Sequence, residues 1–356
     1  MNESEFLRII SGERTDVTAT AMRVLLHGLS WGYGTAVRLR NLAWDIGLSS
    51  VHRPAVPVIS IGNLTTGGTG KTPVTAMLCR MLQDMQHRPG ILSRGYRAQS
   101  EQGNDEFRVL QLTAPGVPHV QNPDRIAGLQ SLLQSADTER PDVILLDDGM
   151  QHRRLGRTLN LVLVDASNPF GFGRLLPRGL LREPLSGFRR ADAVILTRCE
   201  LASASQLDQL RRTITKLAPH LRDNLLELEF RPTGLRDGGG VSSGLSTLQQ
   251  TPVWLLSGIG NPNAFRRTCE QAGGTIAGTS WFPDHHHFTE EELRQVRQLQ
   301  EQSRAAFVLT TLKDLVRIPP QPGFQALEIE AVLQQEHQER LLGLLQATVS
   351  HHNGGI

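Results

Sequence analysis

Residues 65–73 of the chain read Thr65-Thr66-Gly67-Gly68-Thr69-Gly70-Lys71-Thr72-Pro73. The apolar run at 56–61 before this stretch predicts a buried strand, and residues 74–85 after it predict a helix. A glycine-rich turn that ends in Gly-Lys-Thr between a strand and a helix is typical of a phosphate-binding loop, because its backbone N–H groups and the helix N-terminus attract anions. Thr65 takes the place of the first glycine of the usual pattern. The stretch therefore predicts nucleotide binding by a P-loop protein.

The residues of this loop have distinct expected roles. We expect the whole stretch Thr65–Thr72 to surround the phosphates of the nucleotide. The ammonium group of Lys71 should reach the β- and γ-phosphates, and the hydroxyl group of Thr72 should hold Mg²⁺.

The composition describes a soluble globular protein. Of 356 residues, 39% are hydrophobic and 20% are charged, and the formal net charge of +2 does not predict a nucleic-acid partner. The cysteines lie far apart without a CxxC pair, so neither a disulfide framework nor a cysteine zinc site is expected. No apolar run is long enough for a membrane span, and residues 1–14 do not resemble a signal peptide. We therefore expect a cytoplasmic protein.

Strand-like and helix-like runs alternate along the chain, which predicts a mostly parallel sheet covered by helices. The predicted strands of the first part are 56–61, 88–92, 142–146, 159–164 and 193–196, and its predicted helices are 74–85, 122–136 and 201–217. Residues 231–250 are rich in Gly, Ser and Thr and predict a linker or exposed loop. A second α/β unit follows, with predicted strands 253–256 and 306–310 and predicted helices 263–272 and 290–302.

These runs divide the chain into an N-terminal segment 1–50, a P-loop core 51–232, a linker 233–250 and a smaller α/β domain 251–348. Within the first segment, residues 17–44 predict a helix with apolar residues at helical spacing and with Trp, Tyr and Arg side chains. One interpretation is an amphipathic helix that lies on anionic lipid. The other is a helix packed on the core of the domain, and the pattern alone favours this second interpretation.

Two carboxylates, Asp147 and Asp148, end the apolar run that begins at residue 143. A P-loop protein places its metal-associated acid at this position, and the alternative is an acidic turn at a strand end. Gln151 and His152 follow at once and bring polar groups to the same edge of the sheet. Arg94 follows the predicted strand 88–92 and is suited to clamp a phosphate or an acceptor group, although a plain turn explains it equally well.

Two further segments carry charged groups. Asp105 and Glu106 lie in a predicted loop, where either acid could accept the proton of a hydroxyl acceptor, although a solvated acidic loop is the simpler interpretation. The segment 170–184 is rich in Gly and Pro and contains Arg182 and Glu183. Its arginines suit phosphoryl groups, and Glu183 could add to a metal shell.

Residues 284–287 read Asp-His-His-His and precede a predicted helix. Adjacent histidines rarely face one metal ion and no second ligand cluster accompanies them, so a zinc site is not favoured. We expect instead a pair of Asp284 and His285 that projects from the second domain toward the nucleotide.

Taken together, these segments resemble the tetraacyldisaccharide 4′-kinase (lipid A 4′-kinase) family, in family order and over roughly residues 25 to 320. The matching segments are Ser60-Ile-Gly-Asn63, Gly67-Gly-Thr-Gly-Lys-Thr-Pro73, Ser93-Arg-Gly-Tyr96, Asp105-Glu106, Leu146-Asp-Asp-Gly-Met-Gln-His-Arg-Arg154, Leu163-Val-Asp165, Pro177-Arg-Gly-Leu-Leu-Arg-Glu-Pro184, Gly258-Ile-Gly-Asn-Pro262, Phe282-Pro-Asp-His-His286 and Thr311-Leu-Lys-Asp314. The chain departs from the family pattern at Asn104 to Phe107, where one residue separates the glycine from the acidic pair and the usual proline is absent.

The resemblance implies a kinase that uses ATP and Mg²⁺ to phosphorylate the 4′-hydroxyl of a tetraacylated glucosamine disaccharide 1-phosphate. It implies a peripheral location on the cytoplasmic face of the inner membrane, with the N-terminal helix as the membrane-surface element. We expect a monomer with no nucleic-acid partner. Two alternatives stay open: a soluble P-loop kinase with a small polar acceptor, and a nucleotide-dependent switch without transfer.

The resemblance also assigns residues to roles. Asp105 becomes the first choice for the base, and His285 completes the site together with Lys71, Asp147 and Asp148. The residues expected on the substrate side are Asn63, Arg94, Tyr96, Gln151, His152 and Arg182. The residues expected around the metal ion are Thr72, Asp147, Glu106 and Glu183.

Overall fold

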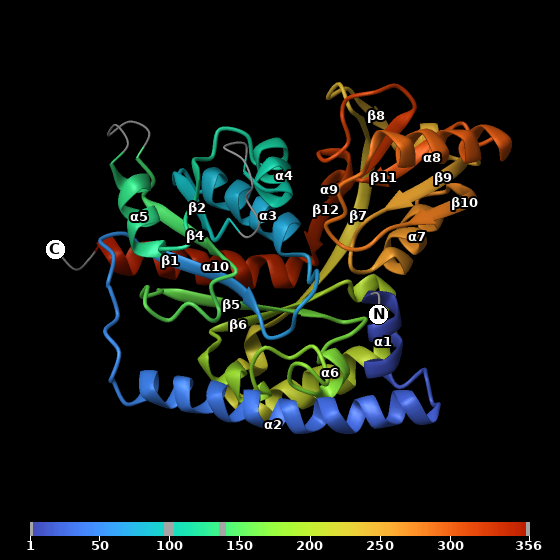
Figure 1. The fold of residues 1–356 in the computed structure, drawn as a ribbon. Coiled ribbons are helices and arrows are strands. Elements are labelled where there is room, and N and C mark those ends of the chain that lie inside the picture. Colours follow the sequence, from blue (N-terminus) through green and yellow to red (C-terminus); the bar gives the residue numbers. More distant parts are fainter. Residues whose placement is uncertain (1–2, 96–102, 135–139, 354–356) are drawn as a thin grey trace. The chain divides into compact units, whose positions relative to one another are not determined.

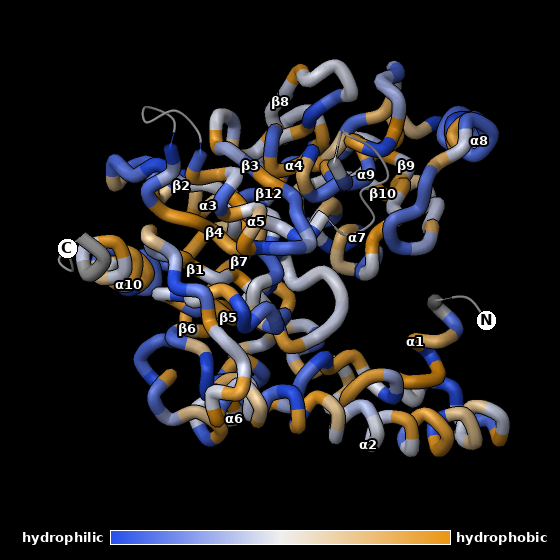
Figure 2. The backbone as a smooth tube through the Cα atoms, turned by 60° about the vertical axis from the view of Figure 1, so that its left-hand side comes forward, coloured by the Kyte–Doolittle hydropathy of each residue, from blue (hydrophilic) through white to orange (hydrophobic). Residues whose placement is uncertain are grey.

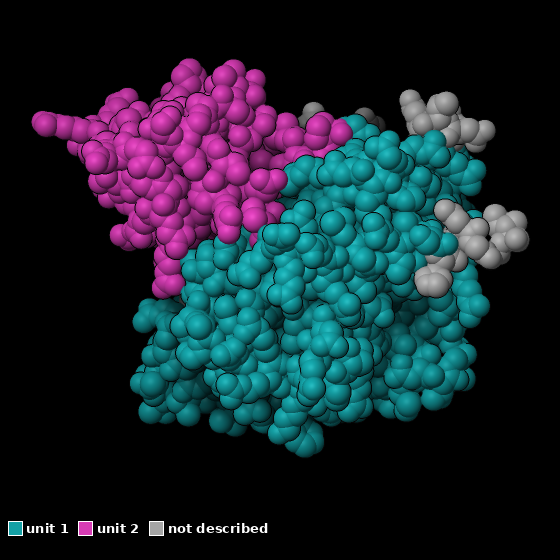
Figure 3. Space-filling model, turned by 180° about the vertical axis from the view of Figure 1, so that it is seen from behind, with its two compact units in different colours: residues 1–96, 116–229, 333–356 teal, residues 97–115, 230–332 magenta. Residues whose placement is uncertain are grey.

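The structure is a computed structural model that describes residues 3–95, 103–134 and 140–353. The chain divides into two compact units, which are coloured teal and magenta in Figure 3. Unit 1 consists of Met1–Tyr96, Gly116–Glu229 and Leu333–Ile356, and unit 2 consists of Arg97–Pro115 and Phe230–Val332. Each unit is therefore assembled from segments that are separated in the sequence.

Unit 1 is built on a parallel sheet with the strand order β7-β6-β5-β1-β4-β2-β3 (Figure 1). Its strands are β1 (Val58–Asn63), β2 (Pro89–Ser93), β3 (His119–Gln121), β4 (Val143–Asp147), β5 (Leu159–Asp165), β6 (Ala193–Thr197) and the beginning of β7 (Leu225–Asp237). Every residue of β1, β4, β5 and β6 is buried, as expected for parallel strands covered on both faces. The predicted parallel α/β fold is confirmed.

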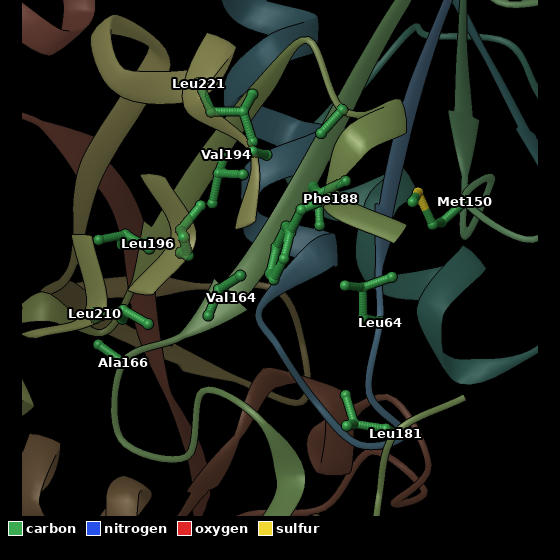
Figure 4. Packing of buried hydrophobic residues seen from close by; sticks show 14 of the residues in the cluster. Leu64, Met150, Val164, Ala166, Leu181, Phe188, Val194, Leu196, Leu210 and Leu221 are labelled. Carbon is green, nitrogen blue, oxygen red and sulfur yellow. The ribbon is translucent and has the colours of Figure 1, made fainter. Parts of the chain in front are cut away.

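The helices of unit 1 cover this sheet. They are α1 (Glu3–Ser11), α2 (Val17–Asp45), α3 (Lys71–Asp84), α5 (Arg125–Leu133), α6 (Ala204–Leu217) and α10 (Gln335–Asn353). One of the hydrophobic clusters of the unit is centred on Phe188, which is 1% exposed, and Figure 4 shows Val164, Val194 and Leu64 around its ring. The cluster also includes Met150, so the core reaches the segment that follows the acidic end of β4.

Helix α2 has an inner face that contacts unit 1 and an outer face with exposed apolar side chains. Its inner face packs on the segment 175–182: the Ser30 hydroxyl donates to the Leu175 carbonyl (2.9 Å), and the Tyr33 hydroxyl donates to the Arg182 carbonyl (2.8 Å). Val17, Val24 and Trp31 recur every seven residues and share the outer face, where they are 85%, 69% and 72% exposed. Figure 2 shows the hydrophobic residues that recur along this helix. The helix therefore packs on unit 1 and also presents apolar side chains to the exterior.

Within the part of the chain that the structure describes, the helices are either too short or too polar to cross a membrane.

Unit 2 contains a second α/β arrangement, with the strand order β10-β9-β11-β12-β7 and with β8 antiparallel to β7. Its strands are the end of β7, β8 (Ser242–Gly244), β9 (Pro252–Ser257), β10 (Thr275–Trp281), β11 (Phe307–Thr311) and β12 (Phe324–Leu333). Its helices are α4 (Asp105–Thr113), α7 (Pro262–Gln271), α8 (Glu290–Gln302) and α9 (Leu312–Leu315). Neighbouring strands β9, β10, β11 and β12 are paired in parallel.

Two segments differ from the expectation for loops. Asp105 and Glu106 form the first turn of α4, because the Asn104 side chain accepts a hydrogen bond from the Phe107 backbone N–H (3.0 Å) and caps the helix. The segment 231–250 contains the end of β7 and the short strand β8, whose pairing satisfies backbone groups that a free loop would expose to water.

Candidate active site

The glycine-rich loop connects the end of β1 at Asn63 to the start of α3 at Lys71. Gly70 precedes the helix with φ of 82°, a left-handed conformation that a side chain would strain. The loop is fixed by its neighbours: the Thr66 N–H donates to the Leu180 carbonyl (2.7 Å), and the Thr197 hydroxyl donates to the Thr69 carbonyl (2.9 Å). The geometry expected of a phosphate-binding loop at a helix N-terminus is therefore present in unit 1.

Asp148 is the centre of a charged cluster beside this loop. Arg182 donates two hydrogen bonds to its carboxylate, both at 2.9 Å, and the Lys71 Nζ atom lies 3.5 Å from Oδ1. Asn63 joins the cluster, because its side-chain oxygen accepts from Arg182 and from Lys71. Burial opposes the ionisation of Asp148, but Lys71 and Arg182 outweigh it and hold the pKa of this carboxyl below its usual range. The Asp148 carboxylate therefore orients the side chains of Lys71 and Arg182.

The segment after Asp148 lies close to β1. The Gly149 N–H donates to the Ile61 carbonyl (3.1 Å), and the Gln151 side chain donates to the Asn63 carbonyl (3.0 Å). A Cβ atom at Gly62 would lie 2.5 Å from the Cβ atom of Met150, so only glycine permits this approach. The structure thus brings Gln151 to the group formed by Asn63, Lys71, Asp148 and Arg182.

The other residues expected on the substrate side are less closely connected to this group. His152 is half-buried, and burial together with Arg125 and Arg157 lowers its pKa to about 4, so its imidazole is neutral at pH 7. Arg94 is exposed after the end of β2. Tyr96 lies outside the described residues.

Thr72 and Asp147 are two of the residues of unit 1 that we expect from the sequence to hold a magnesium ion. Thr72 is in the first turn of α3, and Asp147 is the last residue of β4, paired in register with Ile61 of β1. Among the described residues, no group of three or more His, Cys, Asp or Glu side chains is arranged to hold a metal ion. One carboxylate and one hydroxyl are nevertheless a suitable donor set, because Mg²⁺ keeps several water molecules and takes the remaining oxygens from phosphates.

Glu183 has a different environment from the one expected of a metal ligand. Its side chain is fully buried, and its two oxygens accept from Arg40 (3.1 Å), Asn41 (3.0 Å) and Arg190 (2.6 Å). These donors occupy both oxygens and connect α2 to the segment 183–190. Glu183 is therefore a structural counter-charge and not a proposed metal ligand.

Replacing Glu183 with glutamine should lower the free energy of unfolding by about 2 kcal/mol, because Arg40 and Arg190 lose a buried counter-charge. Thermal unfolding with and without Mg²⁺ measures this effect, with the exposed Glu336→Gln as the matched control. Unchanged stability with a loss of activity that excess Mg²⁺ restores would instead make Glu183 a metal ligand.

Unit 2 contains a second charged cluster, which is centred on Asp105. His285 Nδ1 lies 3.0 Å from Oδ2 of this carboxylate, and the same oxygen lies 3.3 Å from Arg317 Nη2 and 3.8 Å from Lys313 Nζ. Burial would raise the pKa of Asp105, but the hydrogen bond with His285 and the charges of Lys313 and Arg317 lower it to about 2. Asp105 is therefore ionised at neutral pH.

The expected pair of Asp284 and His285 belongs to this cluster. His285 Nε2 lies 3.9 Å from the Asp284 carboxylate and 3.3 Å from Lys313 Nζ, which in turn lies 3.6 Å from Asp284. Glu106 is in the same first turn of α4 as Asp105. His286 instead pairs with Glu292 (3.0 Å) and stacks on Phe282.

Sequence reasoning missed the roles of Lys313 and Arg317. The available signal was the segment Thr311–Asp314, which matched the family pattern but to which no role was given. Its threonine caps the short helix α9, which places Lys313 within 4 Å of Asp105 and is followed by Arg317.

Comparisons with known proteins identify the family to which the chain is similar. The family model for Tetraacyldisaccharide-1-P 4'-kinase matches residues 22–346. A tetraacyldisaccharide 4'-kinase of Anaeromyxobacter dehalogenans (strain 2CP-C) is 39% identical over 308 residues, which cover 81% of this chain and 79% of the relative. One from Geobacter metallireducens is 36% identical over 327 residues, covering 87% and 93%.

A solved structure is similar over nearly the whole chain. It is the "apo" form of LpxK from Aquifex aeolicus in complex with ATP, and it matches with a TM-score of 0.73 and 30% sequence identity. The match covers 92% of this chain and 99% of that chain. The chain therefore belongs to the tetraacyldisaccharide-1-P 4'-kinase family.

Proposed function

We propose that the protein transfers the γ-phosphate of ATP to the 4′-hydroxyl of a tetraacylated glucosamine disaccharide 1-phosphate, a step of lipid A biosynthesis. The observation that carries this proposal is the fixed glycine-rich loop beside the Lys71–Asp148–Arg182 cluster in a chain of this family. The relatives named above are tetraacyldisaccharide 4'-kinases, and the solved relative is a complex with ATP.

The nucleotide phosphates lie on residues 65–72 in this proposal. Lys71 and Arg182 are held near the loop by Asp148 and supply positive charge to the phosphoryl group as it transfers. Thr72 and Asp147 would hold Mg²⁺, whose charge neutralises phosphate oxygens when it is bound. Asn63 and Gln151 are proposed to position the acceptor, because both lie in the cluster and carry amide groups suited to sugar hydroxyls.

Asp105 is proposed as the base for the acceptor. The 4′-oxygen forms a bond to the γ-phosphorus, the bond between the γ-phosphorus and the bridging oxygen to the β-phosphate breaks, and ADP leaves. The proton of the hydroxyl passes to the Asp105 carboxylate, which His285, Lys313 and Arg317 keep ionised.

Transfer of labelled phosphate from ATP to a detergent-dispersed tetraacylated disaccharide 1-phosphate tests the proposal directly. We expect a labelled lipid product that Lys71→Ala abolishes. ATP binding without a labelled lipid would reject the proposed acceptor and leave a small-acceptor kinase or a nucleotide switch.

We further propose that the protein acts as a peripheral protein on the cytoplasmic face of the inner membrane. The support is the outer face of α2, where Val17, Val24 and Trp31 are largely exposed. Apolar side chains in one stripe of a helix favour insertion at the headgroup boundary of a bilayer. A lipid acceptor with four acyl chains would be met at such a surface.

Replacing Val24 and Trp31 together with glutamine should weaken binding to phospholipid vesicles at least about tenfold, because two large apolar side chains no longer leave water. Thermal stability should change little, since both side chains are exposed. Vesicle flotation measures the partition, with Val241→Gln and Leu299→Gln, two exposed apolar residues of unit 2, as the control pair. Equal losses in both pairs would argue against α2 as the membrane contact.

A further inference from the structure

Unit 1 contains a cavity of about 530 Å³ that none of the roles above uses. It is lined by Trp44, Val51, Arg53, Pro54, Arg153, Leu155, Gly156, Arg157, Thr158, Asn160 and Arg190. Arg53, Arg157 and Arg190 shortly precede the strands β1, β5 and β6, so the cavity lies where these strands begin. The glycine-rich loop follows the other end of β1, and a strand of this length spans roughly 18 Å. The cavity is therefore separate from the proposed nucleotide site.

The lining of the cavity is strongly basic. Arg53, Arg153, Arg157 and Arg190 contribute four guanidinium groups, and no lining residue is acidic. Arg153 is paired with Asp45 (2.7 Å) and Arg190 with Glu183 (2.6 Å). Among the described residues, no carboxylate lies within ion-pair distance of Arg53 or Arg157. The positive charge of the cavity is thus compensated only in part.

Arg157 is the clearest case of this incomplete compensation. Its guanidinium donates to two backbone carbonyls, those of Met150 (3.2 Å) and His152 (3.1 Å). Burial, followed by the neighbouring Arg190 and Arg153, lowers the pKa of Arg157 to about 10. The side chain stays protonated at neutral pH at an energetic cost, which a bound anion would reduce.

Two buried polar atoms of the lining residues have no hydrogen-bond partner among the described residues. They are Nε of Arg190, a donor, and Oδ1 of Asn160, an acceptor on a residue that is only 3% exposed. The Asn160 amide N–H is already used by the Arg190 carbonyl (2.6 Å). Buried polar groups normally have partners, so these two atoms add to the unfavourable polar character of the lining.

The surroundings of the cavity favour a lipid over a soluble anion. Ile46 and Leu48 follow the end of α2 and are 61% and 76% exposed, and Val51, which lines the cavity, is 49% exposed. Trp44, near the end of the same helix, also lines it and lies under the Arg153 guanidinium (5.9 Å). A basic cavity beside exposed apolar side chains fits a headgroup whose acyl chains stay outside.

We propose that this cavity binds the phosphate of an anionic phospholipid headgroup such as that of phosphatidylglycerol. Arg53, Arg157 and Arg190 contact the phosphate. The site is distinct from the phosphoryl-transfer site, so its occupancy does not depend on turnover.

Flotation with vesicles of phosphatidylcholine alone, and with phosphatidylglycerol added, tests the site at physiological salt. The test variant is Arg53→Glu, since Arg53 is exposed and its replacement leaves the core intact, and the control is Arg267→Glu, an exposed arginine of α7 in unit 2. Phosphatidylglycerol should increase the vesicle partition of the wild type, and we expect this increase to be about thirtyfold smaller in Arg53→Glu. The reason is that charge reversal removes the attraction of about two unit charges. The control should stay within about twofold of wild type.

Three results would overturn the proposal. Equal losses in both variants would mean general electrostatic attraction without a site. If inorganic phosphate stabilises the wild type against heat but does not stabilise Arg53→Glu, and flotation is the same for both, the cavity binds a soluble anion. A raised KM of Arg53→Glu for the disaccharide substrate, with unchanged flotation, would assign the cavity to the phosphate of that substrate. Failed phosphate transfer by the wild type would concern only the proposed function.

Discussion

Replacing Lys71 with alanine is expected to reduce phosphate transfer by at least about a thousandfold. Lys71 is the first residue of α3, and its ammonium group lies 3.5 Å from both Asp148 Oδ1 and Asn63 Oδ1, which hold it beside the loop. Removing one preorganised donor from a developing oxyanion costs about 10²- to 10³-fold, and Lys71 also carries a full charge. Arg182 keeps Asp148 paired in the variant, so the fold should persist.

Single-turnover transfer at saturating ATP measures this effect on the chemical step. Lys216→Ala, an exposed lysine in the last turn of α6, is the matched control and should retain wild-type activity. A Lys71→Ala variant that melts as wild type does but transfers phosphate at more than about a tenth of its rate would contradict the proposed role.

Replacing Asp105 with alanine is expected to reduce turnover by about 10²- to 10⁴-fold, as for other general bases, and to leave ATP affinity within a few-fold. Asp105 belongs to a cluster in unit 2 and acts on the acceptor in our proposal, whereas the glycine-rich loop belongs to unit 1. Steady-state kinetics with ATP titrations separates the two effects. Near-normal turnover would move the role of the base to Glu106 or to an aspartate at the end of β4.

The same variant has an expected pH signature in stability. Because the folded-state pKa of Asp105 is lowered from 3.8 to about 2, its ionised carboxylate adds to the free energy of unfolding above pH 3.8. This contribution disappears as the pH falls through 2. This shift corresponds to about 2 kcal/mol at neutral pH. The stability difference between wild type and Asp105→Ala should therefore shrink between pH 4 and pH 2, and a difference that stays constant would show that the charge of Asp105 does not stabilise the fold.

The fold follows closely from the sequence where a residue pattern has one physical solution. Continuous apolar runs as short as 143–146 are typical of strands buried on both faces, because helices are usually longer, and β4 is such a strand. The glycine-rich loop was equally clear, because few other arrangements need that spacing of glycine, lysine and threonine. The cap of α4 was visible in principle, since Asn104 precedes a run with helical spacing, but the expectation of a loop concealed it.

The candidate site was less predictable, because its contacts join residues that are far apart in the chain. Asp105 and His285 are separated by 180 positions, and no local pattern records that Arg317 reaches the same carboxylate. The burial of Glu183 depends on Arg40 and Arg190, which come from α2 and from the segment before β6. The catalytic and binding roles themselves stay predictions until the variants above are measured.

The division of each unit among distant segments has a consequence for synthesis on the ribosome. Unit 1 includes α10, whose Leu341 and Leu345 are fully buried, so the unit that contains the first residues cannot complete its core until these leucines have left the exit tunnel. By contrast, the last segment of unit 2 ends at residue 332 and therefore leaves the exit tunnel before α10 does. We therefore expect unit 2, although it lies later in the gene, to be the first of the two to become resistant to protease during translation.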